Sequence, residues 1–292
     1  MQTNDFYRAF EDRFRGSREG IKKRLEIYLP FLLPLKNIYP EGNSIDIGCG
    51  RGEWLELLKE NHMAVEGVDF DKGMLNACWE LGLNASQGDG IAMLREQADE
   101  SLIVVSAFHV VEHISFEELQ VLISEAFRIL KPGGLLILET PNPENIKVAT
   151  ESFYVDPTHI KPIVSPLLSF LPEYFGFLRT TVLKLQENRD NIDRKNITLM
   201  QVLSEVSPDY AVVAQKKAPD NTLELFKDLF TKQYGLSLQS LANSFEKRLK
   251  RIEDRTIQSE RRINIIWKLT KPFRWIKKKQ AYYLSKKVNK CV

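Results

Sequence analysis

The sequence has little cysteine, proline and glycine, and it lacks long apolar runs. Its 292 residues include 3 cysteines (Cys49, Cys78 and Cys291), which lie too far apart for a disulfide framework or a cysteine metal cluster. The 13 prolines and 15 glycines are too few for a collagen-like or low-complexity chain. No apolar stretch reaches the roughly 18 residues of a membrane-spanning helix, and the first residues do not resemble a signal peptide. We therefore expect a protein of the reducing cytoplasm.

Acidic residues are missing from the end of the chain. Of the 41 basic and 39 acidic residues, eleven basic and no acidic ones lie in residues 261–292. The remaining 260 residues therefore carry nine more acids than bases. An acidic body with a basic tail favours chemistry in the body and attachment of the tail to an anionic surface or polymer.

Short apolar runs alternate with helical patterns between residues 44 and 140, which is typical of strands and helices on a parallel sheet. Strands are expected there at 44–47, 65–69, 102–106 and 135–138, and helices at 53–61 and 116–130. Two later apolar runs, 181–185 and 210–214, predict edge strands that close the sheet. The sequence therefore predicts an α/β fold with helices on both faces of the sheet.

Further segments surround this sheet. We expect a helical cap in residues 1–40 and the sheet domain in 41–217, with an apolar, proline-rich insertion at 141–179. Residues 218–292 have a helical pattern and end in the basic tail. Within them, apolar residues recur about every eleven residues over 236–267, which predicts a weak coiled coil that serves as a spacer or in oligomerisation.

Three alternating glycines follow the first predicted strand. Gly48, Gly50 and Gly52 let the backbone turn sharply, and they let a ligand approach the bare main chain. The N-terminus of the helix that follows offers unpaired N–H groups to an anion. This pattern differs from the G-x-G-x-x-G pattern of dinucleotide sites, and a tight turn without a ligand is the alternative.

Two acids have the spacing expected of nucleoside contacts. Asp69 ends the second predicted strand, where an acid can accept hydrogen bonds from both hydroxyls of a ribose. Asp89, within Gly88-Asp89-Gly90, follows a third predicted strand and could face an adenine amino group. The alternative for each is a plain acid at the end of a strand.

These motifs together resemble those of class I S-adenosylmethionine-dependent methyltransferases. The glycine motif that begins at Asp46, the two acids, the Phe108–His113 turn and Leu130–Gly134 match in order and spacing over residues 40–217. The resemblance implies a Rossmann-like sheet and S-adenosylmethionine as cofactor. It also implies that the three glycines wrap the methionine part, Asp69 binds the ribose and Asp89 the adenine. Asp46 then holds the loop or the cofactor's amino group.

Several polar residues are candidates for handling the acceptor. A hydroxyl acceptor needs a base, and the Phe108–His113 turn places His113 at the edge of the sheet where ligands bind. His159 lies in the insertion, and we expect it to be the base with Asp156 orienting it, with His113 as the next candidate. The scattered carboxylates (Asp156, Glu173, Asp190 and Asp193) do not have the spacing of a divalent-ion site, so no metal is predicted.

Further segments point to the acceptor. Residues 10–19, 139–145 and 154–162 resemble bacterial methyltransferases of O-antigen and other surface-polysaccharide pathways, and residues 266–275 resemble the ends of polysaccharide glycosyltransferases. This resemblance implies a lipid-linked polysaccharide acceptor. A methyl ether at the non-reducing end of a glycan would remove the hydroxyl needed for extension, so we hypothesise that the enzyme stops chain growth. Residues 236–267 are expected to bind either a glycosyltransferase partner or a second copy of this chain. Aromatic and basic residues alternate in 261–292, which predicts peripheral binding to the anionic inner face of the cell membrane.

Alternatives from other classes stay open. The same basic tail could bind nucleic acid, which we rank below the membrane, and the enzyme would then methylate RNA. A second alternative is an enzyme that methylates a small lipid-like acceptor such as a quinone precursor. The chain could also be a non-catalytic tether of a polysaccharide-synthesis complex to the membrane.

Overall fold

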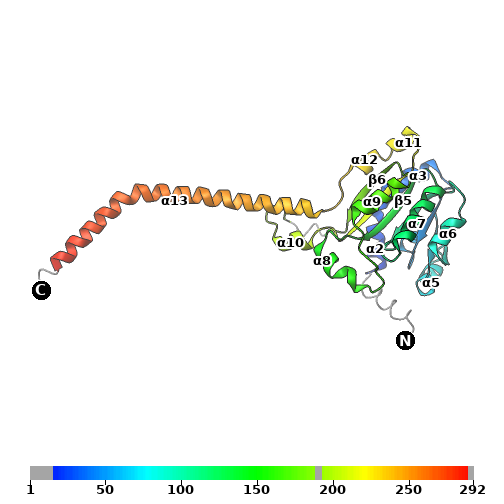
Figure 1. The fold of residues 1–292 in the computed structure, drawn as a ribbon, viewed down its shortest axis with the longest axis horizontal. Coiled ribbons are helices and arrows are strands. Elements are labelled where there is room, and N and C mark those ends of the chain that lie inside the picture. The colour runs from blue at the N-terminus through cyan, green and yellow to red at the C-terminus, as the bar shows by residue number, and fades with distance from the viewer. Residues whose placement is uncertain (1–15, 188–192, 289–292) are drawn as a thin grey trace, which may run out of the picture. The chain divides into compact units, whose positions relative to one another are not determined.

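The computed structural model describes residues 16–187 and 193–288, with side chains up to Tyr282 (Figure 1). The start of the predicted cap, Asp190 and Cys291 lie outside the described residues. The chain divides into two compact units. The first contains the residues up to 187 and Met200–Leu238, and the second contains Asp193–Leu199 and the chain from Gln239 onward.

The first unit is built on one sheet of seven strands in the order β3-β2-β1-β4-β5-β7-β6. β7 runs antiparallel to both of its neighbours, and the remaining pairs are parallel. The predicted α/β sheet is therefore confirmed. The strands are β1 (Asn43–Ile47), β2 (Ala64–Asp69), β3 (Ala85–Gln87), β4 (Leu102–Phe108), β5 (Leu130–Pro141), β6 (Arg179–Leu185) and β7 (Asp209–Gln215).

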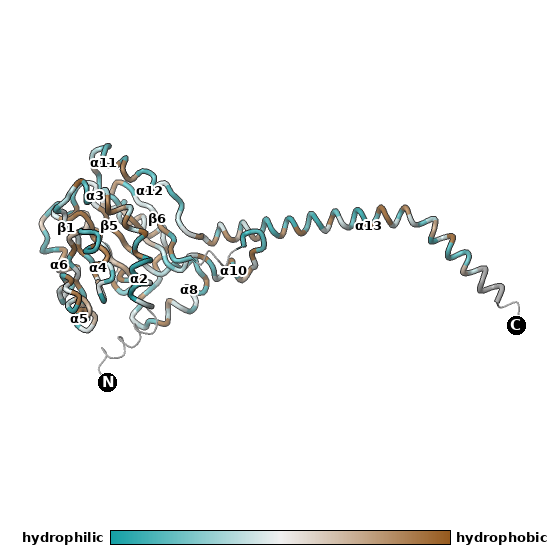
Figure 2. The backbone as a smooth tube through the Cα atoms, turned by 180° about the vertical axis from the view of Figure 1, so that it is seen from behind, coloured by the Kyte–Doolittle hydropathy of each residue, from teal (hydrophilic) through white to brown (hydrophobic). Residues whose placement is uncertain are grey.

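Helices cover both faces of this sheet (Figure 1). Side chains alternate along β5: Leu136 and Leu138 pack in one apolar cluster with α6, α7 and α9, whereas Leu135 and Ile137 pack in the other with α3 and α4. Figure 2 shows the apolar strands inside this layered unit. The helices are α2 (Arg18–Leu25), η1 (Glu26–Tyr28), α3 (Leu29–Ile38), α4 (Glu53–Glu60), α5 (Lys72–Glu80), α6 (Gly90–Glu96), α7 (Phe116–Ile129), α8 (Ile146–Thr150), η2 (Ser152–Val155), α9 (Ser165–Tyr174), α10 (Leu199–Ser204), α11 (Asp220–Glu224) and α12 (Lys227–Thr231).

Local chemistry explains where the main helices begin. Ser115 caps α7, and the Glu118 side chain binds the Ser115 N–H in return, which completes a capping box. The side chain of Asp71 caps α5 and that of Asp89 caps α6. These caps fix the residues at which α5, α6 and α7 begin. They therefore limit the length of the loops that follow β2, β3 and β4 and form the site.

Two expectations about the sheet need correction. The run at 210–214 is not an edge strand, because β7 lies between β5 and β6 and is buried. The compact unit also continues past residue 217 to Leu238, since Phe226 of the α11–α12 segment is fully buried in the cluster with α3. Phe226 follows a largely polar stretch, so the spacing of apolar residues does not reveal that it is buried.

The second unit is dominated by one long helix, α13 (Leu238–Val288), which continues through Pro272. Arg248 and Arg251 donate hydrogen bonds to the carbonyls of Ile197 and Lys195, so residues 193–199 are tied to its first turns. Apolar and polar residues are interspersed along it (Figure 2). The helical tail is thus confirmed, whereas the coiled coil stays a prediction. Among the described helices, none is long and apolar enough to cross a membrane.

Candidate functional site

The candidate site lies where the strand order reverses, between β1 and β4. The loops that follow these two neighbouring strands turn to opposite faces of the sheet, and this leaves a crevice beyond the carboxyl ends of the strands. The glycine loop follows β1 and the turn that begins at His109 follows β4. The two are in close contact, because a Cβ on Gly48 would lie 2.5 Å from Cγ2 of Val110.

The glycine loop has the backbone that its sequence predicts. Gly48, Gly50 and Gly52 all have positive φ, at 65°, 53° and 79°, a region that other residues enter only with strain. The Asp69 carboxylate accepts hydrogen bonds from the N–H groups of Gly50 and Asp71, both at 2.8 Å. The loop after β1 is therefore held by the acid at the end of β2.

Asp46 lies beneath this loop. It is 2% exposed, and its carboxylate accepts a 2.7 Å hydrogen bond from the Ser106 hydroxyl on β4. This bond joins the two strands that border the crevice. Asp46 therefore ties β1 to β4 just before the glycine loop begins.

Asp89 and Phe70 border the same end of the site. Asp89 is exposed, and its Oδ1 accepts the N–H groups of Ile91 and Ala92 at the start of α6. Phe70 follows Asp69 and is 71% exposed, and no motif in the sequence marks it as a site residue. Gln87 binds the Phe70 carbonyl and so keeps this aromatic residue beside β3. The exposed ring of Phe70, with Asp69 and Asp89 at the same end of the site, offers a flat apolar surface on which a nucleobase can stack.

A buried carboxylate organises the turn after β4. Glu112 is 1% exposed and accepts hydrogen bonds from the Thr140 hydroxyl at 2.9 Å and from His109 Nδ1 at 3.2 Å. His109 Nε2 lies 3.6 Å from Glu139 on β5. Desolvation lowers the pKa of His109, but its contacts with Glu112 and Glu139 outweigh this and leave the pKa well above 6.5. The two carboxylates therefore favour the protonated form of His109, although part of its ring reaches solvent.

His113 belongs to a chain of hydrogen bonds that runs into the insertion. Its Nδ1 lies 2.9 Å from the Thr158 hydroxyl, which lies 2.6 Å from Asp156 Oδ1. Burial lowers the pKa of His113, and the nearby His159 lowers it further, so that the net shift is downward despite Glu112. A neutral imidazole is thus favoured at this position.

The predicted pairing of Asp156 with His159 needs correction. The Asp156 carboxylate is bound by the backbone N–H and the hydroxyl of Thr158, and His159 Nδ1 instead lies 2.5 Å from the Phe153 carbonyl. The Asx turn at Asp156 favours the near neighbour over the ring three residues away. The structure nevertheless brings His159 to His113, with ring centroids 4.6 Å apart.

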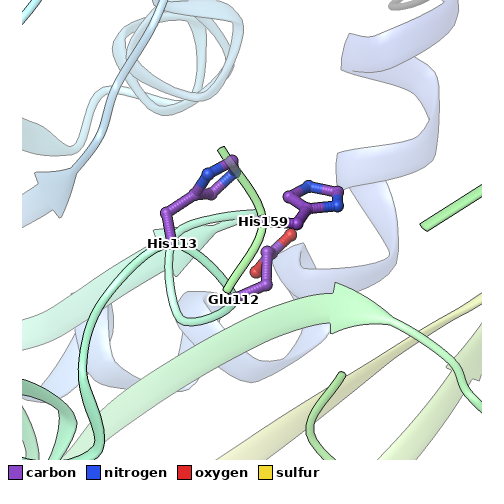
Figure 3. Close-up of side chains that lie close together, drawn as sticks. All are labelled: Glu112, His113 and His159. Atoms are coloured by element: carbon purple, nitrogen blue, oxygen red, sulfur yellow. The ribbon is translucent and has the colours of Figure 1, made fainter. Parts of the chain in front are cut away.

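Two groups of polar side chains therefore meet beyond the carboxyl end of β4. In the first, Glu112, His113 and His159 each offer a ligand atom within 4.8 Å of the others, and Figure 3 shows the three side chains close together. In the second, His109, Glu139 and Asp209 lie together in the same way. Glu139, Asp209, Thr140 and Thr158 were missed in the sequence, because strand register and a loop bring them here.

The sequence and structure were compared with those of known proteins. The methyltransferase domain family matches residues 45–138. The structure is similar to that of a SAM-dependent methyltransferase from Archaeoglobus fulgidus, with 33% identity and a TM-score of 0.63, over 72% of this chain and 100% of that one. This chain belongs to the SAM-dependent methyltransferases. The predicted enzyme class and the predicted cofactor, S-adenosylmethionine, are confirmed.

More distant relatives are named for different acceptors, among them tRNA, demethylmenaquinone and malonyl-acyl-carrier protein. A probable S-adenosylmethionine-dependent methyltransferase of Mycolicibacterium smegmatis is 28% identical over 46% of this chain. A demethylmenaquinone methyltransferase of Bacillus pumilus is 26% identical over 50% of it. The chain spans only 51% and 65% of these two proteins. The family of the methyltransferase therefore does not identify its acceptor.

The residues at the switch point fit S-adenosylmethionine. The turn at Gly48 has no room for a Cβ beside Val110, and the three glycines hold positive φ angles that keep side chains out of the loop. Asp69 and the exposed Phe70 follow at the carboxyl end of β2, where the nucleoside of the cofactor would lie. The cofactor supplies a methyl group on a positively charged sulfur. The methyltransferase itself has to hold the acceptor in line with that methyl group, since positioning accounts for most of the acceleration in such a displacement.

Proposed function

We propose that this methyltransferase transfers a methyl group to a hydroxyl of a sugar in a lipid-linked surface polysaccharide of the O-antigen type. The observation that carries the O-methylation is the pair of imidazoles, His113 and His159, beside a buried carboxylate at the acceptor end. A hydroxyl is a poor nucleophile until it loses its proton, and a positioned basic group accelerates that loss by roughly 10²–10⁴-fold. We propose that the cluster of these two imidazoles and the carboxylate binds the acceptor hydroxyl and promotes the loss of its proton.

The cofactor contacts are proposed on the geometry of the glycine loop. Gly48, Gly50 and Gly52 would border the methionine part, with Asp46 supporting the loop below it. Asp69 would bind the ribose, because its carboxylate lies at the carboxyl end of β2 directly beside the glycine loop. Asp89 would face the adenine, since its Oδ1 is used by the start of α6 and its second oxygen is left for a base.

The polysaccharide acceptor is supported by the segments that resemble O-antigen methyltransferases and by the character of the tail. Residues 261–292 combine eleven basic residues with exposed aromatic ones, among them Trp267, Phe273 and Trp275. Arg274 stacks on Trp267 at 4.0 Å and Lys279 on Trp275 at 4.2 Å. Such a surface suits the interface of an anionic membrane, at which a lipid-linked acceptor is made.

A small lipid-like acceptor is the second candidate, because the similarity to a demethylmenaquinone methyltransferase favours it. Methyl-labelled S-adenosylmethionine, offered with membranes, total lipid extract or RNA of the source cell, distinguishes these acceptors. We expect label in an acid-hydrolysable glycan, and much less of it with Asp69→Ala. Label in lipid extract alone, or in RNA alone, would contradict the polysaccharide proposal. An altered glycan length after deletion would add chain termination to the function.

A further inference from the structure

Two histidines and one glutamate at the acceptor end have the arrangement of an unfilled metal site. Glu112 and His113 are neighbours in the turn after β4, and His159 comes from the insertion 46 residues later. A backbone hydrogen bond of 2.8 Å from Ile160 N–H to the Glu112 carbonyl joins the two segments. One ligand atom of each side chain lies within 4.8 Å of the other two (Figure 3). A shift of a side chain by an ångström or so would close them around one ion.

The hydrogen bonds around His113 determine which of its nitrogens is free. The Thr158 hydroxyl has one hydrogen. The short 2.6 Å contact indicates that the hydroxyl donates this hydrogen in a hydrogen bond to Asp156 Oδ1. The hydroxyl oxygen must then accept the hydrogen bond from His113 Nδ1. His113 therefore carries its proton on Nδ1 and keeps the lone pair of Nε2.

His159 and Glu112 are held in the same way. A carbonyl oxygen only accepts, so the 2.5 Å contact with Phe153 places the His159 proton on Nδ1 and leaves its Nε2 free. Glu112 is oriented by the Thr140 hydroxyl and by His109. In protein metal sites, ligating histidines donate the other ring N–H to a carbonyl or to a carboxylate-linked group, and ligating carboxylates are themselves hydrogen-bonded. All three side chains have this second layer.

We infer that Glu112, His113 and His159 bind a divalent transition-metal ion through one carboxylate oxygen and the two Nε2 atoms. Two imidazoles and one carboxylate suit Zn²⁺, Mn²⁺, Fe²⁺ or Co²⁺, whereas Mg²⁺ and Ca²⁺ prefer oxygen ligands alone. Three protein ligands leave at least one position open, as in catalytic rather than structural sites. The scattered carboxylates of the sequence gave no sign of it, because the third ligand is distant along the chain.

The open position gives the site a purpose, and this step rests on the proposed function. A hydroxyl bound there would lose its proton more readily, because a bound cation lowers the pKa of a coordinated oxygen acid by several units. The proton passes to solvent, the new O–CH₃ bond forms as the S–CH₃ bond breaks, and S-adenosylhomocysteine leaves. A sugar with two adjacent hydroxyls would suit such a site, since its second oxygen can bind as well.

The test is metal binding by the full-length, tag-free protein after removal of metal, without cofactor or acceptor. We expect one Zn²⁺ or Co²⁺ per chain, with a Co²⁺ absorption band typical of imidazole ligands and no competition from excess Mg²⁺. Glu112→Gln, His113→Gln and His159→Gln should each weaken binding at least 100-fold, and Thr158→Val about 10-fold. His62→Gln, at an exposed histidine outside this cluster, is the matched control and should change nothing.

Binding of S-adenosylmethionine shows whether each variant is folded, because these side chains are not in the glycine loop. Absence of stoichiometric binding, or binding that survives both histidine substitutions in a folded protein, would overturn the metal site. Metal binding that depends on the three residues, in a protein that methylates no hydroxyl acceptor, would support the site and reject the proposed function instead. The two hypotheses can thus fail separately.

Discussion

The Asp69 carboxylate accepts the Gly50 N–H at 2.8 Å, so the acid after β2 holds the glycine loop after β1. We predict that Asp69→Ala weakens S-adenosylmethionine binding by roughly 10–100-fold, because both this bond and a charged contact to the ribose are lost. Asp71→Asn is the matched control. Asp71 caps α5, and Asn caps a helix equally well, so neither stability nor cofactor affinity should change much. Calorimetric titration checks both, and equal affinities in the two variants would contradict the assignment of Asp69.

Gly48→Ala should damage both stability and cofactor binding. Its φ of 65° strains any side chain, and the new Cβ would lie 2.5 Å from Val110 Cγ2. Gly82→Ala has a similar φ of 60°, but its Cβ would meet nothing nearer than Lys59 Nζ at 3.9 Å. Both should pay about 1–2 kcal/mol for the backbone, and only Gly48→Ala should lose more. Denaturant unfolding measures this difference, and Val110→Ala should restore part of it.

Tyr28→Phe should destabilise the first unit by about 1–2 kcal/mol. The Tyr28 hydroxyl is fully buried and donates to Glu139, which Gln186 also binds at 3.2 Å. Removing the hydroxyl leaves a buried carboxylate with fewer donors. Tyr39→Phe loses a hydrogen bond to the Pro132 carbonyl in a half-exposed place, and it should cost less. The two unfolding midpoints, measured at one pH, provide the comparison.

The first half of the sheet could be predicted from the sequence, because each strand ends in a residue type that marks its end. The three glycines follow β1, and Asp69 closes β2. For the later strands, the sequence predicts that they exist but not their bounds or their order in the sheet. β5 begins at Leu130, at the first residue after α7, and Pro132 and Gly133 lie within it despite being breaking residues. No local pattern shows that β7 is inserted between β5 and β6.

The site residues could be predicted where they lie within one turn of the chain. They could not be predicted where the pairing of distant segments brings them together. The turn with Glu112 and His113 was recognised, and so was His159 in the insertion. Their convergence depends on how Ile160 pairs with the Glu112 carbonyl, which no spacing in the sequence indicates. Asp156 was assigned to His159 because the two are close in sequence, but a turn at Asp156 gives its carboxylate to Thr158.

Asp209 should make stability fall as pH rises. Burial, with Glu139 and Glu112 nearby, raises its pKa from 3.8 to about 6, although His109 and Arg24 oppose this. The folded state therefore holds a proton that the unfolded state releases, and stability is lost between pH 4 and 6. Asp209→Asn should gain roughly 1–2 kcal/mol over the native protein at pH 7, less than the full shift because the carboxylate is partly exposed, and nothing below about pH 4. Urea unfolding across this range tests the trend, and exposed Asp254→Asn should not show it.

The tail should bind anionic membranes through its charge and aromatic rings together. Replacing Lys277, Lys278 and Lys279 with Gln removes three of the eleven basic residues of 261–292. At about 1 kcal/mol for each well-placed basic residue, binding of the full-length protein to phosphatidylglycerol vesicles should weaken up to roughly 100-fold. The matched control replaces Lys247, Lys250 and Arg255, which carry the same charge on the earlier turns of α13. Trp267→Ala with Trp275→Ala should weaken vesicle binding even at high salt, since the apolar contribution is not screened. Equal losses in the two triple variants, or tighter binding to RNA than to vesicles, would contradict a membrane-bound tail.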